Sequence, residues 1–331
     1  MINLAFIGCG YMAKMHASVA LAQGHKIKAV LSTKRSKKID IFSKTFHIPF
    51  KYYNFEDFLG DINQKELDVD AIVVCTPWNV TETIINKVLN TQLPVLVEKP
   101  VCLSESSLIK VMNNSNSKRM LVGYNRKFYD YIPALVDHLK TNPPYLVEIL
   151  SAEPFDYIVR QNGKEIIPYL PHFYTSHLID TIIFTMGIIE PEVIFHLKEK
   201  SGQSILAFLR SVKANVPITL KITMDSPQNS YIKFFFNNKV ILLSPLEVMT
   251  VYDRLDQITY NEKRIYKPNE QEKIETCYDF KPGLFNQMKH FTSSYVNTVK
   301  ESSQEQEELI CLTRICDWLT KNKISQKDIQ A

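Results

Sequence analysis

After Met1 the chain reads Ile2-Asn3-Leu4-Ala5-Phe6-Ile7 and then Gly8-Cys9-Gly10-Tyr11-Met12-Ala13. The apolar run predicts a buried strand, and the residues from Lys14 to Ala22 predict a helix. Strand, Gly-x-Gly-x-x-Ala and helix in this order are the fingerprint of a dinucleotide-binding unit. Only 9 of the 331 residues are glycine, against a usual share of about 7%, so two glycines at this point are informative.

Each small residue of this loop has a physical task. The first glycine permits the tight turn, the second lets backbone approach a pyrophosphate, and Ala13 lets helix and strand pack closely. We expect the pyrophosphate at the helix N-terminus, where unpaired N–H groups and the helix dipole favour an anion. The residues predicted to contact it are Gly8, Gly10, Tyr11 and Met12. The alternative is a tight turn of this shape in another doubly wound fold.

Composition narrows the class of protein. A length of 331 residues accommodates about two domains, and 45% hydrophobic with 22% charged residues is ordinary for a globular protein. The net charge of +4 is mild, and no basic stripe is interleaved with aromatic residues, so we expect no nucleic-acid partner. The most apolar stretch, Leu178 to Phe195, contains Asp180, Glu190 and Pro191, so we expect no membrane span.

The cysteines indicate the compartment. None of the six forms a Cys-x-x-Cys pair, and no Cys/His spacing is typical of zinc, so no metal site is predicted. They are typical of reduced thiols in a cytosolic protein. The N-terminus starts directly as a strand without a basic leader, so we expect a cytoplasmic protein without a signal peptide.

The first third alternates short apolar strands with helices, which indicates a parallel sheet covered on both faces. The expected strands are residues 2–7, 26–31, 49–53, 69–75, 94–97 and 120–123. After Tyr124 the pattern changes to an α+β domain with a large, open, mainly antiparallel sheet between Glu192 and about Arg264. We therefore predict a dinucleotide-binding Rossmann domain over 1–123 and a substrate-binding and oligomerisation domain over 124–331.

The helices expected in the second domain are residues 127–140, 172–186, 284–300 and 305–321, and the segment between Ser151 and His172 is expected to be irregular.

Three ends of the predicted parallel strands carry notable residues, and ligands bind at the carboxyl ends of such strands. They are the glycine loop, Cys75-Thr76-Pro77-Trp78 and Glu98-Lys99-Pro100. A lysine at a strand end can hydrogen-bond a substrate hydroxyl and assist its deprotonation, and burial makes it a better proton acceptor. Lys99 is therefore the predicted catalytic residue, the alternative being a surface lysine.

A second centre is Ser176-His177-Leu178-Ile179-Asp180. Residues three apart on a helix share a face, so His177 and Asp180 would point the same way. Histidine is a general acid or base near neutral pH, and Asp180 would orient the histidine or a sugar hydroxyl. The alternative is a helix-packing histidine with a solvated aspartate.

The second strand ends Leu31-Ser32-Thr33-Lys34-Arg35. NAD enzymes usually carry an acid here for the ribose 2′-OH, whereas hydroxyls and cations suit a 2′-phosphate. The absence of an acid favours NADP(H) over NAD(H), with Ser32, Thr33, Lys34 and Arg35 as contacts. The alternative is the solvated start of a helix.

Taken together, these motifs resemble the Gfo/Idh/MocA family, the group of glucose–fructose oxidoreductase and inositol dehydrogenase. The resemblance rests on Gly8-x-Gly10 with His16, Thr76-Pro77, Glu98-Lys99-Pro100, Gly123-Tyr124-Asn125-Arg126-Lys127-Phe128, His177-x-x-Asp180 and Gln287-x-x-x-Phe291. It implies hydride transfer between nicotinamide and a sugar-like hydroxyl or ketone, in a protein that forms homodimers or homotetramers through the second sheet. By position it implies that Lys99 is the catalytic lysine, His177 the catalytic histidine and Asp180 a substrate-side aspartate.

The chain departs from the family pattern at three positions. Phe173 stands where an Asp is frequent, Thr81 where a histidine is usual, and Lys127 where arginine is common. His172 and Tyr174 are the candidates for replacing the missing carboxylate. The Ser-His-x-x-Asp form, with Pro245-Leu246-Glu247 and Lys281-Pro282-Gly283, is similar to members that act on nucleotide sugars or polysaccharide precursors.

Two other functions remain open: a non-catalytic dinucleotide-binding regulator, which the loss of the Asp at Phe173 favours, and an NAD-dependent glycosidase. We expect substrate specificity to lie in residues 155–171 and in the sheet face, where no motif names the substrate.

Overall fold

The computed structural model describes residues 1–34, 36–199, 202–297 and 303–321. The chain forms two compact units, one of residues 1–128 and 278–310, the other of residues 129–277 and 311 onwards. The predicted boundary at 123 lies close to the end of the first segment. The predicted division differs in one respect, because residues 278–310 return to the first unit.

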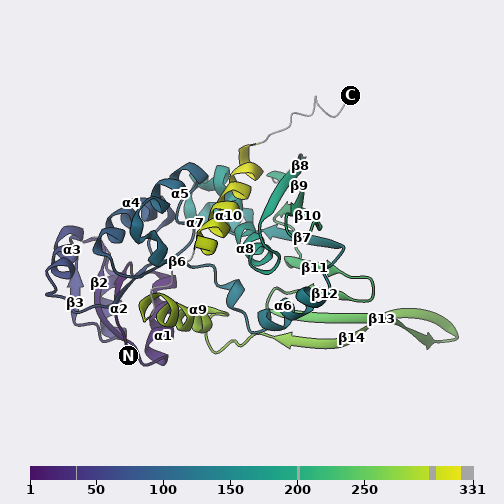
Figure 1. The fold of residues 1–331 in the computed structure, drawn as a ribbon, viewed down its shortest axis with the longest axis horizontal. Coiled ribbons are helices and arrows are strands. Elements are labelled where there is room, and N and C mark those ends of the chain that lie inside the picture. The colour runs from purple at the N-terminus through teal and green to yellow at the C-terminus, as the bar shows by residue number, and fades with distance from the viewer. Residues whose placement is uncertain (35, 200–201, 298–302, 322–331) are drawn as a thin grey trace. The chain divides into compact units, whose positions relative to one another are not determined.

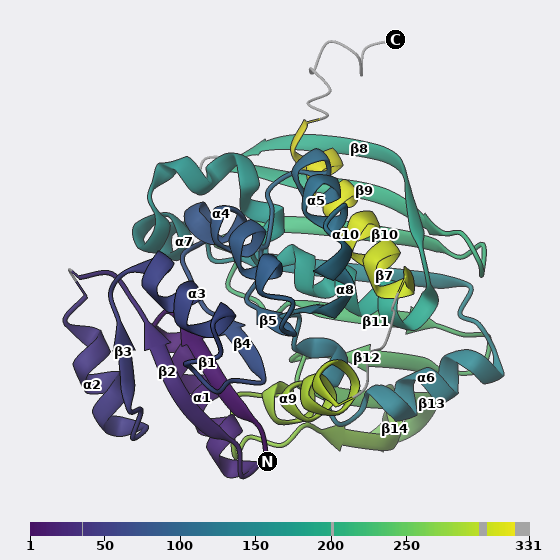
Figure 2. The same ribbon diagram turned by 60° about the vertical axis from the view of Figure 1, so that its left-hand side comes forward.

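The sheet of the first unit is parallel throughout and has the strand order β3-β2-β1-β4-β5-β6 (Figure 2). Its strands are β1 (Asn3–Ile7), β2 (Lys26–Leu31), β3 (Phe50–Tyr52), β4 (Ala71–Val74), β5 (Val95–Val97) and β6 (Met120–Val122). The strand order reverses between β1 and β4, which is where ligands bind in open α/β sheets. The predicted Rossmann sheet is confirmed.

Helices flank this sheet. They are α1 (Tyr11–Ala22), α2 (Lys38–Thr45), α3 (Phe55–Asn63), α4 (Trp78–Val88), α5 (Glu105–Met112) and α9 (Leu284–Phe291). One core joins α1, α2 and α9 to the sheet, with Phe6, Phe42 and Phe291 fully buried. The small residues Ala13 and Ala17 are also fully buried, so α1 lies close to the strands.

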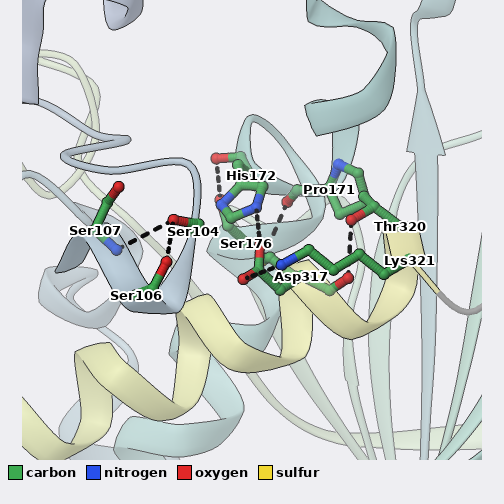
Figure 3. Close-up of polar contacts among 10 residues, drawn as sticks. Ser104, Ser106, Ser107, Pro171, His172, Ser176, Asp317, Thr320 and Lys321 are labelled. Atoms are coloured by element: carbon green, nitrogen blue, oxygen red, sulfur yellow. Dashed lines mark hydrogen bonds and ion pairs between the residues drawn. The ribbon is translucent and has the colours of Figure 1, made fainter. Parts of the chain in front are cut away.

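Two helix starts expected in this unit have side-chain caps. The Asn54 side chain accepts a hydrogen bond from the Glu56 N–H at 2.8 Å, and the Ser104 hydroxyl accepts one from the Ser107 N–H at 3.1 Å (Figure 3). Each cap satisfies an N–H that a helix start leaves without a partner.

The second unit contains an eight-stranded sheet in the order β14-β13-β12-β11-β7-β10-β9-β8 (Figure 1). Its strands are β7 (Leu146–Glu153), β8 (Ile189–Glu199), β9 (Gly202–Ser211), β10 (Pro217–Met224), β11 (Tyr231–Phe235), β12 (Val240–Leu243), β13 (Val248–Tyr260) and β14 (Lys263–Glu275). Only the β7–β10 pair is parallel, which confirms the mainly antiparallel sheet.

The sheet extends beyond Arg264, where it was expected to end, because β14 continues to Glu275. β14 is exposed along most of its length, so it lacks the apolar alternation by which a strand is recognised.

Helices cover one face of the second sheet. They are α6 (Ile132–Thr141), α7 (Phe155–Asn162), α8 (Thr175–Met186) and the part of α10 (Ser303–Lys321) from residue 311, with a 3₁₀ segment over Lys164–His172. The expectation of an irregular segment after Ser151 is therefore wrong for residues 155–172. Pro168 and Pro171 within the 3₁₀ segment obscured its helical character in the sequence.

Candidate functional site

A cavity of about 640 Å³ lies at the carboxyl ends of the first unit's strands. The expected cofactor-site residues that line it are Gly8, Gly10, Tyr11, Met12, Ser32, Thr33, Cys75, Thr76, Pro77, Glu98 and Lys99. The three strand-end motifs found in the sequence therefore meet at one cavity. Its position at the β1–β4 reversal is the expected place for a ligand in this fold.

Two described residues expected at this site, Lys34 and Trp78, are not in its lining. Lys34 is exposed to solvent, and Trp78 begins α4 outside the lining. Arg35 lies outside the described residues. The lining instead includes residues that sequence reasoning missed, namely Ser36, Lys38, Tyr53, Phe55, Val80 and Ile84. Position is their only sequence signal, since all except Ile84, which lies within α4, follow soon after a strand end or lie in the first turn of a helix.

The two loop glycines differ in what they do. Gly8 has φ of +100°, and a Cβ there would collide with the carbonyl of Cys75. Its N–H donates to the Leu31 carbonyl at 2.8 Å. Gly10 precedes α1, and no atom lies within 4 Å of where its Cβ would be. Gly8 is therefore required by the fold, whereas Gly10 leaves open space above the backbone.

This open space fits the pyrophosphate of a dinucleotide. The first turn of α1 contains no acidic residue, and no side chain caps its N–H groups. Its N–H groups and the positive end of the helix dipole are thus left for an anion.

The contrast gives a paired prediction. Gly8→Ala should destabilise the protein by about 2–4 kcal/mol, because it combines a strained φ with a backbone collision. Gly10→Ala should change stability by only about 1 kcal/mol or less yet weaken dinucleotide binding, because its methyl enters the open space. Urea unfolding and nicotinamide-fluorescence titration measure the two effects. Equal stability losses in both variants would contradict this assignment.

Glu98 and His16 form a buried pair beside the cavity. Nε2 of His16, which is 1% exposed, lies 2.8 Å from Oε1 of Glu98. Burial by itself would raise the pKa of the Glu98 carboxyl. The hydrogen bond from His16 and the charges of His16, Lys99 and Lys281 outweigh burial and hold that pKa below its ordinary value of 4.5. Glu98 therefore stays ionised next to Lys99 at neutral pH.

The lowered pKa of Glu98 predicts a pH dependence of stability. A depressed carboxyl pKa stabilises the fold above the unfolded-state value of 4.5, and this contribution is lost as pH falls through the folded-state pKa. The difference in unfolding free energy between wild type and Glu98→Gln should therefore shrink from about pH 6 to about pH 3. Asp57→Asn, which removes an exposed carboxylate of α3, is the control. A difference that is constant over this range would refute the assignment.

Cys75 and Thr81 are neutral side chains in and next to the Cys75-Thr76-Pro77 loop at the cavity. Burial, and then the charge of Glu98, raise the pKa of the Cys75 thiol well above its ordinary value, so it remains a neutral thiol. Thr81, at the position usual for a histidine, is buried, lies 2.9 Å from the Thr76 hydroxyl and donates to the Pro77 carbonyl at 3.0 Å. It thus holds the strand-end loop and adds no titrating group.

The second unit carries the other expected centre on α8. His177 and Asp180 lie in the first turns of this helix, as predicted, and Asp180 is 8% exposed. The His177 N–H donates to the Tyr174 carbonyl at 3.0 Å, and its carbonyl accepts from the Thr181 hydroxyl at 2.9 Å. Lys99 belongs to the other unit. The structure thus places His177 and Asp180 on one helix and Lys99 in the first cavity.

The residues before α8 show what replaced the frequent Asp. Phe173 is 9% exposed and follows the 3₁₀ segment, so an apolar ring occupies this position. Nε2 of His172 lies 3.6 Å from Oδ1 of Asp317 (Figure 3). The other carboxylate oxygen of Asp317, Oδ2, accepts a hydrogen bond from Nζ of Lys321 at 2.9 Å. The buried His172 is therefore held against α10, and Asp317 is a partner that the sequence did not predict.

A buried acid at the start of α8 was also missed. Glu153 on β7 is 1% exposed and accepts from the Thr175 N–H at 3.0 Å and from the Ser151 hydroxyl at 3.2 Å. It satisfies an N–H at the start of the helix that carries His177, so it positions that helix. The sequence signal was weak, because a glutamate at a strand end is commonly solvated.

Membrane spans and metal clusters were sought in both units. In the ranges that the structure describes, no helix is long and apolar enough to span a bilayer. Within those same ranges, no cluster of three or more His, Cys, Asp or Glu side chains is arranged to hold a metal ion.

Residues 2–140 match the model of the Gfo/Idh/MocA family, an oxidoreductase family with an NAD-binding Rossmann fold. The matched part of the chain is similar to that family and includes the glycine loop, Thr76-Pro77 and Glu98-Lys99-Pro100. The uncharacterized oxidoreductase YrbE of Bacillus subtilis (strain 168) is 27% identical over 172 residues, which is 49% of either chain. The inositol 2-dehydrogenase of Rhizobium meliloti (strain 1021) is 26% identical over 175 residues, 49% of this chain and 50% of that protein. The chain thus spans about half the length of these curated relatives.

Solved structures resemble nearly the whole chain. The UDP-N-acetylglucosamine 3-dehydrogenase GnnA of Acidithiobacillus ferrooxidans has a TM-score of 0.72 at 12% identity, covering 97% of this chain and 99% of its own. At this identity the likeness establishes the shared fold alone.

Proposed function

We propose that the protein is an NAD(P)-dependent oxidoreductase that moves a hydride between nicotinamide and a hydroxyl-bearing or keto carbon of a sugar or nucleotide sugar. The cavity of the first unit carries this proposal. It combines the glycine loop and the uncapped start of α1 with Lys99, a proton-handling residue, in one lining. The names of the inositol 2-dehydrogenase and the UDP-N-acetylglucosamine 3-dehydrogenase support the substrate class.

In this proposal Lys99 takes the proton of the substrate hydroxyl during oxidation and returns it during reduction. His177 serves as the second acid–base residue, and Asp180 orients the histidine or a substrate hydroxyl. A nicotinamide bound in the cavity supplies the hydride acceptor or donor.

We also infer a preference for NADP(H) over NAD(H). Ser32 and Thr33 line the cavity at the end of β2, Lys38 lines it from the start of α2, and exposed Lys34 lies between them in sequence. These hydroxyls and cations suit a 2′-phosphate, and no acid stands at the end of β2 for a free 2′-OH. Arg35 remains a predicted contact.

Replacing Lys99 tests the catalytic proposal. Lys99→Ala should lower kcat by about 10²–10⁴, the usual contribution of acid–base catalysis, while dinucleotide affinity changes little. The matched control is Lys110→Ala, which removes an exposed lysine of α5. Turnover is followed by nicotinamide absorbance with NAD⁺ and NADP⁺ on polyols, sugars and nucleotide sugars. A near-wild-type rate for Lys99→Ala would refute the role of Lys99.

The same assay separates the two alternatives. Dinucleotide binding without turnover of any substrate in the panel would favour a non-catalytic regulator. Release of phenol from an aryl glycoside without net formation of reduced nicotinamide would favour a glycosidase.

We propose further that two copies of the chain associate as a homodimer, or four as a homotetramer, through the face of the eight-stranded sheet that carries no helix. Apolar side chains lie exposed or half-buried on this face along β8 and β9. Val193 is 43% and Leu197 49% exposed, and Val193 pairs with Phe208 across the strands. Exposed apolar side chains grouped on one sheet face are typical of an interaction surface.

Charge on this face should dissociate the assembly. The double variant Val193→Glu/Leu197→Glu should run as a monomer in light scattering, because two carboxylates would be buried without partners at the contact. Ile109→Glu places the same charge at an exposed apolar residue of the first unit and should leave the assembly intact. A wild-type monomer, or an unchanged mass for the double variant, would contradict the proposal.

A further inference from the structure

Two cations of the first unit, Lys281 and Arg126, form no ion pair with a described carboxylate. Nζ of Lys281 lies 3.1 Å from Sδ of Met12 and 5.8 Å from the centre of the Tyr11 ring. A thioether is a weak acceptor, and an aromatic face replaces little of the water around an ammonium. Nη1 of Arg126 is buried without a hydrogen-bond partner in the described parts of the chain. Neither side chain forms an ion pair with a described carboxylate.

Hydrogen bonds join the two segments of the chain that carry Lys281 and Arg126. The side-chain amide of Asn125, the residue before Arg126, donates to the carbonyl of Pro282, the residue after Lys281, at 2.8 Å. Asn125 is itself buried, and Asn286 on α9 donates to the Phe128 carbonyl at 3.0 Å. These two hydrogen bonds join the segment after β6 to the segment before α9, so the arrangement is built into the fold.

The charges around them do not balance. Burial lowers the pKa of Lys281 and Arg126 lowers it further, while Glu98 opposes both. Glu98 already has His16 at 2.8 Å and also interacts with Lys99. One carboxylate thus interacts with two lysines and with the hydrogen-bonded His16. Burying unmatched cations is costly, so an anion from outside the chain is the expected partner.

The position of the cations distinguishes the substrate from the cofactor as the source of that anion. Tyr11, Met12, Glu98 and Lys99 line the dinucleotide cavity, but neither Lys281 nor Arg126 is part of that lining. Lys281 contacts Tyr11 and Met12 of the glycine loop and also interacts with Glu98, the residue before Lys99, so it lies beside the cavity rather than in its lining.

We propose that Lys281 and Arg126 bind an anionic group of the substrate, a phosphate or a carboxylate, and so select a charged sugar derivative over a neutral polyol. This inference rests on the proposed function of the cavity. Both groups offer oxygen acceptors to a guanidinium and an ammonium, and such charge-assisted hydrogen bonds are stronger than neutral ones.

The test measures binding to the cofactor-loaded protein. NADPH and NADH are first titrated into wild type, Lys281→Met and Arg126→Gln, and four probes are then titrated into each holoenzyme by calorimetry. The probes are UDP-N-acetylglucosamine, inorganic pyrophosphate, D-glucuronate and neutral myo-inositol. Lys289→Met, which removes an exposed lysine of α9, is the matched control. The thermal midpoint of each cofactor-free variant reports whether it is folded.

We expect at least one charged probe to bind wild type more tightly than myo-inositol. Lys281→Met and Arg126→Gln should each raise its Kd about 10- to 100-fold, as for the loss of one hydrogen bond to a charged group. Lys289→Met should leave it unchanged, and the cofactor Kd should change less than about twofold in every variant. Weaker binding of both UDP-N-acetylglucosamine and pyrophosphate to the variants would identify the anionic group as a phosphate. Weaker binding of glucuronate alone would identify it as a carboxylate.

Three results would overturn the inference. They are the absence of charged-probe binding to the wild-type holoenzyme, an unchanged charged-probe Kd in folded Lys281→Met and Arg126→Gln, and a cofactor Kd that rises as strongly as the probe Kd. The last would assign the cations to the cofactor's phosphates. Failure of the proposed function is recognised separately, either because neither NADPH nor NADH binds wild type in the first titration or because the nicotinamide-absorbance assay shows no turnover of any substrate in the panel.

Discussion

The close approach of Gly8 to the carbonyl of Cys75 is the constraint on which the first unit depends. These residues follow β1 and β4, the adjacent strands at which the strand order reverses. Any side chain at Gly8 would force the two strand ends apart, and its φ of +100° excludes most other residues. The glycine loop, the start of α1 and the Thr76-Pro77 loop lie around one cavity because this contact is possible. Gly10 then adds the open space that a dinucleotide needs.

Electrostatics makes the far end of the cavity different from the glycine end. The glycine end offers backbone N–H groups, which are neutral and suit a diphosphate. The other end holds an ionised carboxylate, Glu98, whose charge the buried His16 stabilises by a hydrogen bond. Glu98 also interacts with Lys99 and Lys281, and Arg126 lies close enough to Lys281 to lower its pKa.

Most of the Rossmann unit could be predicted because glycines, apolar strands and strand-end motifs are local signals. The presence of Lys38 in the cavity lining could not be predicted, because it depends on the path of the chain after Leu31 rather than on a motif. In the second unit, prolines obscured the helical residues 155–172, and the exposure of β14 removed the alternation that identifies strands. Glu153 and Asp317 were missed because burial of an acid is decided by tertiary contacts. The roles of Lys99, His177 and Asp180 remain predictions.

The return of residues 278–310 to the first unit explains how an unmatched cation is tolerated there. The sequence predicted a single boundary between the two domains. In the structure the chain returns to the first unit, because α9 buries Leu284, Met288 and Phe291 in the Rossmann core. Each fully buried apolar side chain contributes about 1.5–3 kcal/mol, so these three offset a penalty of several kcal/mol for a desolvated charge. Lys281 lies just before α9, so the packing of this helix in the core also fixes Lys281 near Arg126. A cation whose nearest contacts are a thioether and an aromatic ring, and which shares the nearby Glu98 with Lys99 and His16, is better explained by a ligand than by stability.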